Sequence, residues 1–159
     1  MSRTIYESWH DYQVAFAQVL ALATAELCIF DDNLEKTGLA ELPNMEALRF
    51  LLTEHPRASV RIALRDASQL RHRQPRLVQL LRTHSHTLKI QEVSAIHVPR
   101  RDCVILADGL HAVARFDLTQ PRCKLVLDDG NEVQPYAELF AEIWKTPGTP
   151  FAPEIAGLR

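Results

Sequence analysis

Short apolar runs that end abruptly in acidic residues constrain the fold of this chain more than any other sequence feature. The runs Glu26 to Asp32 and Ser59 to Asp66 have the pattern of strands buried on both faces. Around them, apolar residues recur at helical spacing from about Tyr6 to Thr24, after an N-cap at Asn44, and from Gln74 onward. This alternation predicts strands of one sheet separated by helices.

In the second half of the chain, the predicted strands follow one another without helices between them. Four further strands are expected at His86 to Val93, Asp102 to Asp108, Leu110 to Asp117 and Cys123 to Asp129, and the last three are expected to be mostly antiparallel. A closing amphipathic helix follows, with Pro135 in its first turn. The sequence therefore predicts an α/β fold with a mixed sheet of about six strands flanked by helices.

Composition fits one globular domain. The chain has 159 residues, of which 47% are apolar and 24% charged, so we expect a single domain over residues 1–145 and an extended Pro-rich tail over 146–159. The five glycines stand apart from one another, which removes the Gly-rich motifs of the common nucleotide-binding classes.

The cysteines and the apolar runs bear on localisation. Cys28, Cys103 and Cys123 are an odd number of widely spaced residues, which favours buried free thiols in a reducing cytoplasm. The N-terminus lacks the layout of a signal peptide, and no apolar run approaches about 18 residues. We expect a cytoplasmic protein with no membrane contact.

Charge is strongly segregated along the chain. Residues 1–56, 57–101 and 102–159 carry net charges of -6, +8 and -4. The basic centre includes Arg71, Arg73, Arg76 and Arg82, and arginines at a helix entrance can clamp phosphate or nucleic acid. The alternative is that these side chains are solvated or pair with the acidic flanks.

Acidic residues are expected to gather at one edge of the sheet. Asp31, Asp32 and Asn33 end one strand and Asp66 ends the next, and ligands commonly bind at such an edge. Paired carboxylates there can bind a hard cation or act as acid and base, and the alternative is that they cap turns.

A pair of histidines is the second candidate for a metal site. His84 and His86 would share one face of a strand at a spacing that suits zinc, but no third ligand lies nearby and the cysteines are scattered. We therefore predict neither a metal nor a cofactor. Trp9 and Trp144, on the two terminal helices, suit core packing or a homodimer face.

The order of elements, the strand D-C-V-I-L-A-D-G and the final F-x-x-x-W helix resemble one half of the phospholipase D superfamily, over Tyr6 to Trp144. The chain is most similar to the catalytically degenerate bacterial domains of this superfamily that occur alone or attached to GNAT-type acetyltransferases. A D-x-x-x-L-x-x-x-x-P-R-L-x-x-L segment recurs in them, and Asp66 to Leu80 approximates it.

Active members of that superfamily carry H-x-K-x-x-x-x-D, in which the His forms a covalent phosphoryl intermediate and the Lys neutralises phosphate charge. Starting from His97, the Lys position holds Pro99 and the Asp position holds Val104. Aligned instead on Asp108, the His and Lys positions hold Arg101 and Cys103. Neither register supplies the motif.

The resemblance thus implies a non-catalytic binding or scaffolding domain that forms a homodimer, with an acetyltransferase-type protein as a possible partner. A second hypothesis is a divergent phosphodiesterase or nuclease that uses His97, Arg101 and Asp108 from two subunits. A third is a nucleic-acid-binding protein that uses the basic centre. For phosphate or another ligand, the residues to consider are Asp31, Asp66, Arg71, Arg73 and Arg76.

Overall fold

The computed structural model describes residues 2–146 and 148–153. Its strands are β1 (Ser2–Tyr6), β2 (Glu26–Asp31), β3 (Ser59–Leu64), β4 (Leu88–Glu92), β5 (Cys103–Ala107), β6 (His111–Arg115), β7 (Cys123–Leu127) and β8 (Thr149–Pro150). Its helices are α1 (Trp9–Leu22), α2 (Leu42–Glu54), α3 (Leu70–Arg73), α4 (Pro75–Thr83) and α5 (Gly130–Lys145).

All strands join one mixed sheet with the order β1-β7-β6-β5-β2-β3-β4-β8. β2, β3 and β4 run parallel, whereas β5, β6 and β7 follow one another antiparallel. The predicted α/β class, the mixed sheet and the antiparallel second half are confirmed. The described part of the chain has eight strands rather than about six, because β1 pairs with β7 and β8 pairs with β4 at the two edges.

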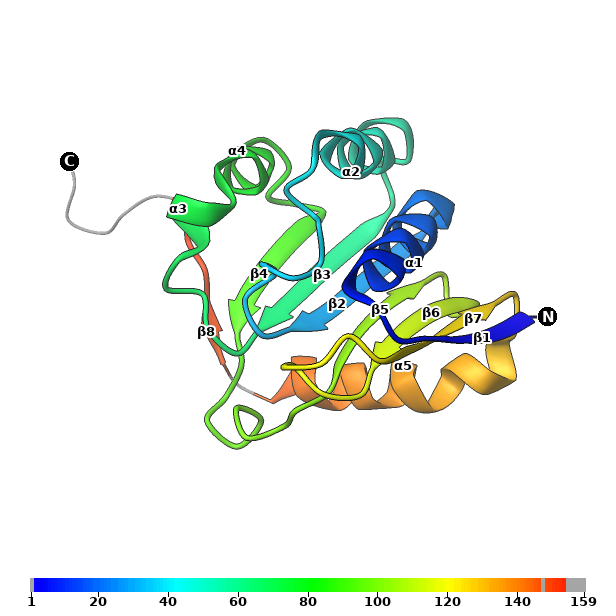
Figure 1. Cartoon of the computed structure of the whole chain (residues 1–159). Coiled ribbons are helices and arrows are strands. Elements are labelled where there is room, and N and C mark those ends of the chain that lie inside the picture. Colours follow the sequence, from blue (N-terminus) through cyan, green and yellow to red (C-terminus); the bar gives the residue numbers. More distant parts are fainter. Residues whose placement is uncertain (1, 147, 154–159) are drawn as a thin grey trace, which may run out of the picture.

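Helices cover both faces of the sheet: α1, α2 and α4 lie on one side and α5 on the other (Figure 1). The four central residues of β2 are apolar because both faces of the strand are covered: Leu27 and Ile29 face the first layer, while Cys28 and Phe30 face α5. Phe140 of α5 belongs to the second cluster.

Helix boundaries differ from the prediction in three places. Tyr6, the expected start of the first helix, is the last residue of β1, where it pairs with β7, and α1 begins at Trp9. α2 begins at Leu42, with Pro43 in its first turn and Glu41 as N-cap. Asn44 is therefore not the cap, and its side-chain amide donates instead to the Gly38 carbonyl oxygen at 2.7 Å. α5 begins at Gly130, because Asp129 caps it through the Glu132 N–H, so Pro135 lies inside the helix rather than in its first turn.

The C-terminal segment lies along the sheet. β8 is part of the expected tail, and the Phe151 N–H donates to the Ile90 carbonyl oxygen of β4 at 2.9 Å. Residues 154–159 of that tail lie outside the described residues. Within the described residues, no helix is long and apolar enough to cross a membrane.

Candidate functional site

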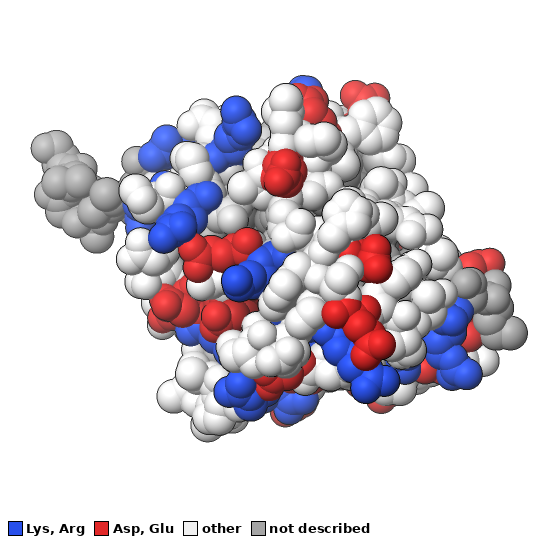
Figure 2. Space-filling view, in the orientation of Figure 1, with Lys and Arg blue, Asp and Glu red and all other residues white. Residues whose placement is uncertain are grey.

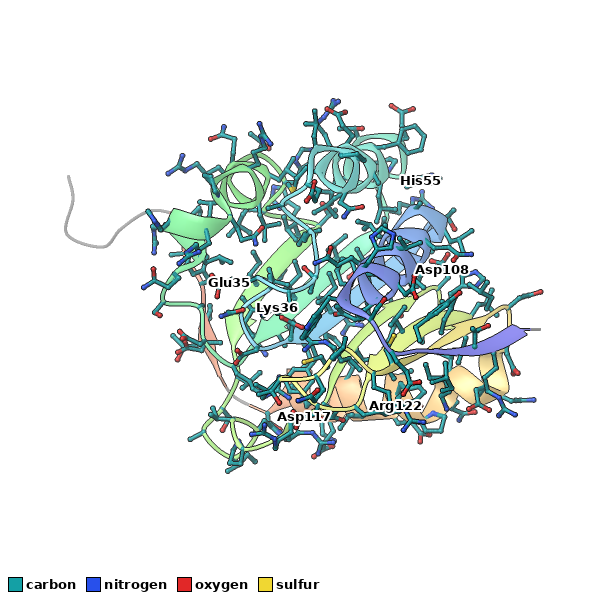
Figure 3. All side chains as sticks on the ribbon, viewed as in Figure 1. Glu35, Lys36, His55, Asp108, Asp117 and Arg122 are labelled. Atoms are coloured by element: carbon teal, nitrogen blue, oxygen red, sulfur yellow. The ribbon has the colours of Figure 1, made fainter. Side chains whose placement is uncertain are left out.

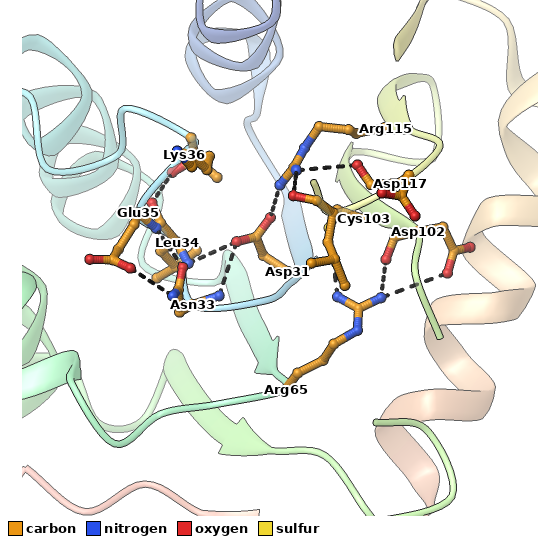
Figure 4. Close-up of polar contacts among 12 residues, drawn as sticks. Asp31, Asn33, Leu34, Glu35, Lys36, Arg65, Asp102, Cys103, Arg115 and Asp117 are labelled. Atoms are coloured by element: carbon orange, nitrogen blue, oxygen red, sulfur yellow. Dashed lines mark hydrogen bonds and ion pairs between the residues drawn. The ribbon is translucent and has the colours of Figure 1, made fainter. Parts of the chain in front are cut away.

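Strand ends from both halves of the fold meet at one edge of the sheet. The parallel strands β2 and β3 end there at Asp31 and Leu64, and the Arg65 N–H donates to the Asp31 carbonyl oxygen at 3.0 Å. β5 begins and β6 ends at the same edge, since Cys103 pairs with Arg115. We call Asp31, Arg65, Asp102, Cys103, Arg115 and Asp117 the polar edge (Figure 4).

An ion pair buried almost completely lies at the centre of the polar edge. Arg115 Nη2 is 2.9 Å from Asp31 Oδ1, and the two side chains are 1% and 2% exposed. The other Asp31 oxygen accepts the Leu34 N–H at 2.7 Å, and Arg115 Nη1 donates to the Leu118 carbonyl oxygen at 2.7 Å. Burial alone would lower the pKa of Arg115, but nearby Tyr12 and Asp31 raise it, so the guanidinium stays charged.

A second buried arginine holds the start of β5. The Arg65 guanidinium donates to the backbone carbonyl oxygens of Arg100 and Asp102 and contacts the Cys103 sulfur at 3.6 Å. It also lies over the Phe30 ring at 4.3 Å from the centroid. Its donors are thus directed at protein groups, not at an open pocket.

In the register aligned on Asp108, the motif's His and Lys positions hold Arg101 and Cys103, and both side chains have partners or are buried. Arg101 makes a two-pronged ion pair with Asp117, with distances of 2.5 and 3.2 Å, and hydrogen bonds from Arg101 and Thr119 hold the pKa of Asp117 well below its usual value. Burial, together with the Asp31 charge, raises the pKa of Cys103 to about 12. The thiol is therefore neutral near pH 7, which removes its nucleophilic form.

A pocket of about 410 Å³ opens beside the polar edge and is lined by Asp31, Asp32, Asn33, Glu35, Lys36, Arg115, Leu118 and Thr119. Burial and the neighbouring Asp31 charge raise the pKa of Asp32. The Asn33 side-chain amide donates a hydrogen bond to Glu35 Oε2 at 2.7 Å. The carboxylates of this lining, Asp31, Asp32 and Glu35, outnumber its two cations, Lys36 and Arg115, which disfavours a phosphate ligand there.

The three residues of the phosphodiesterase hypothesis lie apart. Asp108 follows β5, and its carboxylate accepts the backbone N–H groups of residues 24, 25 and 26 at the opposite end of the sheet. Figure 3 shows Asp108 and Asp117 at opposite ends of the β5 and β6 pair. His97 lies in the loop before β5, with its Nε2 at 3.2 Å from Thr146 Oγ1. One chain therefore does not bring His97, Arg101 and Asp108 together.

The other predicted ligand residues have local partners too. Asp66 lies at the predicted edge beside Asp32. Its carboxylate accepts a hydrogen bond from the Ser68 N–H, and hydrogen bonding to Ser68 lowers the pKa of Asp66. Arg73 pairs with Glu35 at 3.0 Å. Arg71 bonds to the Ala152 carbonyl oxygen and lies over the Phe151 ring.

Basic and acidic side chains lie next to one another on the surface. In Figure 2, basic side chains gather over α3 and α4, with acidic side chains directly beside them. Arg71, Arg73, Arg76 and Arg82 are all exposed, yet Arg82 bonds to Gln79 and to the Pro153 carbonyl oxygen.

The histidine pair is not on a strand. His84 is the C-cap of α4 and His86 lies in the following turn, so the alternation that would align their rings does not apply. Among the described residues, no group of three His, Cys, Asp or Glu side chains can hold a metal ion.

Sequence reasoning missed the two buried arginines, Arg65 and Arg115, because it weighed only acids at the strand ends. The signal is present in the sequence: each arginine directly follows an apolar strand core, in I-A-L-R-D and A-V-A-R-F-D. An arginine at the buried end of a strand needs a carboxylate or carbonyl partner, which predicts a polar network at that edge.

Solved structures share this fold at low sequence identity. The phospholipase D family member Nuc from Salmonella typhimurium matches with a TM-score of 0.65 and 12% identity, over 95% of this chain and 98% of that one. NucT from Helicobacter pylori gives 0.64 and 10%, over 94% and 99%. The fold is therefore phospholipase D-like.

A DNA-binding protein shares the fold as well. TrmBL2, an archaeal chromatin protein described with a novel mode of DNA binding, matches with a TM-score of 0.68 and 13% identity, over 95% of this chain and 55% of TrmBL2. At the level of sequence, the model of the family described as "Domain of unknown function (DUF7931)" matches residues 8–150, and no curated protein matches this chain.

Proposed function

Because this chain belongs to the DUF7931 family, a domain of unknown function, we propose its role from its own geometry: a non-catalytic phospholipase D-like domain that binds or scaffolds another protein. The observation that carries the proposal is the state of Arg101 and Cys103. An active site would need a His nucleophile and a Lys that neutralises phosphate charge at these two positions. Instead, Arg101 forms an exposed ion pair with Asp117, and Cys103 is a buried neutral thiol.

The loops around the polar edge suit a protein partner. Ile96 is 70% exposed, and Val98 and Phe116 are close to half exposed, although each is a large apolar residue. Ile96 and Val98 lie in the loop before β5, and Phe116 follows β6, so all three flank the strand ends described above. Exposed apolar side chains that form one contiguous patch mark an interaction surface, and we propose that these three do so.

We propose that this surface joins two copies of the chain. A homodimer places two polar edges together, as the resemblance implies, and an acetyltransferase-type protein is the second partner to consider. The setting we propose is a bacterial cytoplasm, which the three free buried thiols support.

A light-scattering measurement of mass tests the dimer. The variant Phe116→Asp is expected to be a monomer, and Phe50→Asp is the matched control because Phe50 is 61% exposed on α2 but is not part of this surface. A wild-type monomer would refute the homodimer, and equal behaviour of the two variants would refute this surface as its interface.

Hydrolysis of a generic phosphodiester tests the absence of catalysis. Wild-type protein and His97→Ala are expected to give the same background rate. Activity in the wild-type protein that His97→Ala abolishes would overturn the non-catalytic assignment and restore the phosphodiesterase hypothesis.

Nucleic-acid binding is the second candidate function, favoured by the exposed arginines over α3 and α4 and by the likeness to TrmBL2. Anisotropy of a labelled single-stranded oligonucleotide measures it at about 50 and 200 mM salt, between which phosphate-driven affinity falls steeply. Micromolar, salt-sensitive binding supports this candidate, and no binding at either salt leaves the protein-binding role.

A further inference from the structure

A second pocket lies on the other side of the loop that follows β2. It has a volume of about 440 Å³ and is bounded by that loop, the start of α2 and the start of α4. Its polar lining consists of Gln13, Glu35, Glu41, Gln74 and Arg76. Only Glu35 is shared with the pocket at the polar edge, so the two are separate sites.

Gln74 is the unusual residue of this lining. It is only 4% exposed, and its buried Oε1 accepts no hydrogen bond from any described residue. Buried polar atoms nearly always have a partner, because leaving one unpaired costs stability. Gln74 also lines the pocket, so a bound ligand with an N–H or O–H donor that reaches this oxygen would supply the missing partner.

The start of α4 supplies a positive field beside Gln74. Pro75 occupies the first turn of this nine-residue helix, and no side chain in the described segments caps it. The first N–H groups of a helix lack intrahelical partners and favour an anion. The Arg76 guanidinium is exposed and makes no ion pair with the described residues, which adds a full charge of the same sign.

A carboxylate completes the set of charges. Glu41 lines the same pocket, and its side chain neither caps α2 nor forms an ion pair with the described part of the chain. Glu35 differs, because Arg73 at 3.0 Å already balances its charge. The pocket therefore offers one uncommitted cation, Arg76, one uncommitted anion, Glu41, and one buried acceptor.

We propose that this pocket binds a small amino carboxylate. The carboxylate of the ligand pairs with the Arg76 guanidinium and the N-terminus of α4, while its ammonium group donates to Gln74 Oε1 and to Glu41. A ligand of this class meets both uncommitted charges and satisfies the unpaired acceptor, which an anion alone or a cation alone does not do.

The test is heteronuclear NMR with glycine, β-alanine and γ-aminobutyrate as probes, each at about 20 mM to detect millimolar binding. We expect at least one probe to shift the backbone N–H signals of residues 76 and 77 and the Gln74 side-chain amide. Acetate and methylammonium, the two halves of the ligand, are expected to shift them at least about tenfold less at equal concentration.

Two variants and a control show whether the probe shifts come from this pocket. Arg76→Gln and Gln74→Met should both abolish the probe shifts, whereas Arg57→Gln, which removes the same charge beyond the far end of α2, should leave them unchanged. Gln74→Met should also raise the melting temperature of the free protein, since it removes an unpaired buried acceptor.

Three results would overturn the proposal: no shift with any probe, acetate acting as strongly as the amino carboxylates, or shifts that persist in Arg76→Gln. The phosphodiester assay does not bear on this pocket, so the two proposals fail independently.

Discussion

Arg115 Nη2 and Asp31 Oδ1 lie 2.9 Å apart inside the protein, joining the end of β6 to the end of β2. Arg115 also lies over the rings of Tyr12 and Trp9, at 4.8 and 5.2 Å from their centroids. The pair therefore ties two strands to α1 at the polar edge. Because the polar edge supports the fold, substitutions of its residues should change the stability of the protein.

Breaking the pair should destabilise the protein strongly. Arg115→Met leaves the Asp31 charge buried without a partner, so we expect the free energy of unfolding to fall by about 3–5 kcal/mol. Urea denaturation of Arg115→Met, Asp31→Asn and the double variant measures the coupling, expected at about 1–3 kcal/mol. Strictly additive losses would show that the two side chains do not support each other.

Asp108 should stabilise the fold in a pH-dependent way. Its carboxylate accepts three backbone N–H groups at the start of β2, and these bonds outweigh burial and lower its pKa. A carboxyl with a lowered folded pKa contributes fully above the unfolded pKa, about 4, and loses its contribution as the pH falls through the folded pKa.

We therefore expect Asp108→Asn to cost about 2 kcal/mol at pH 7 and progressively less below about pH 4, as measured by urea unfolding across pH. Asparagine tolerates the positive φ of 59° at this position. Asp128→Asn is the matched control, since Asp128 has a φ of 52° and an exposed side chain. A cost for Asp108→Asn that does not change with pH would contradict this role.

The thiols should be unreactive in the folded protein. Burial raises the pKa of Cys103 to about 12 and the pKa values of Cys28 and Cys123 to about 11. At about pH 8, a thiol-specific disulfide reagent should modify none of them until denaturant is added, and then all three. An added exposed thiol, Ser85→Cys, should react at once; fast native labelling of Cys103 would mean that the polar edge opens.

Gly148 should be essential for attaching β8. A Cβ atom there would overlap the Glu92 carbonyl oxygen, so Gly148→Ala should detach β8 from β4. Amide exchange of the Phe151 N–H is expected to accelerate by about tenfold or more. At Gly130 a Cβ meets its nearest atom at 3.6 Å, so Gly130→Ala should leave the exchange of Phe151 unchanged.

The sequence alone predicts the long, well-patterned elements of this fold. β2 and β3 read as buried strands because helices cover both of their faces, and α1 reads as a helix because its apolar stripe is regular. β1 and β8 escape prediction because they are edge strands of five and two residues, whose state depends on pairing with β7 and β4.

The polar edge was only partly predictable. That Asp31 and Asp66 end neighbouring parallel strands follows from their positions after apolar runs. The partner of Asp31 does not, because Arg115 is 84 residues away and reaches it only through the order of strands in the sheet. A local pattern shows which side chains reach an edge, whereas topology decides which of them neutralise one another.

Intact-mass spectrometry after incubation with excess phosphodiester tests directly whether any side chain of the protein accepts a phosphoryl group. We expect the mass of the protein to stay unchanged, because Arg101 is paired with Asp117 and Cys103 is a buried neutral thiol. A mass increase that corresponds to a phosphoryl adduct and maps to His97 would contradict it.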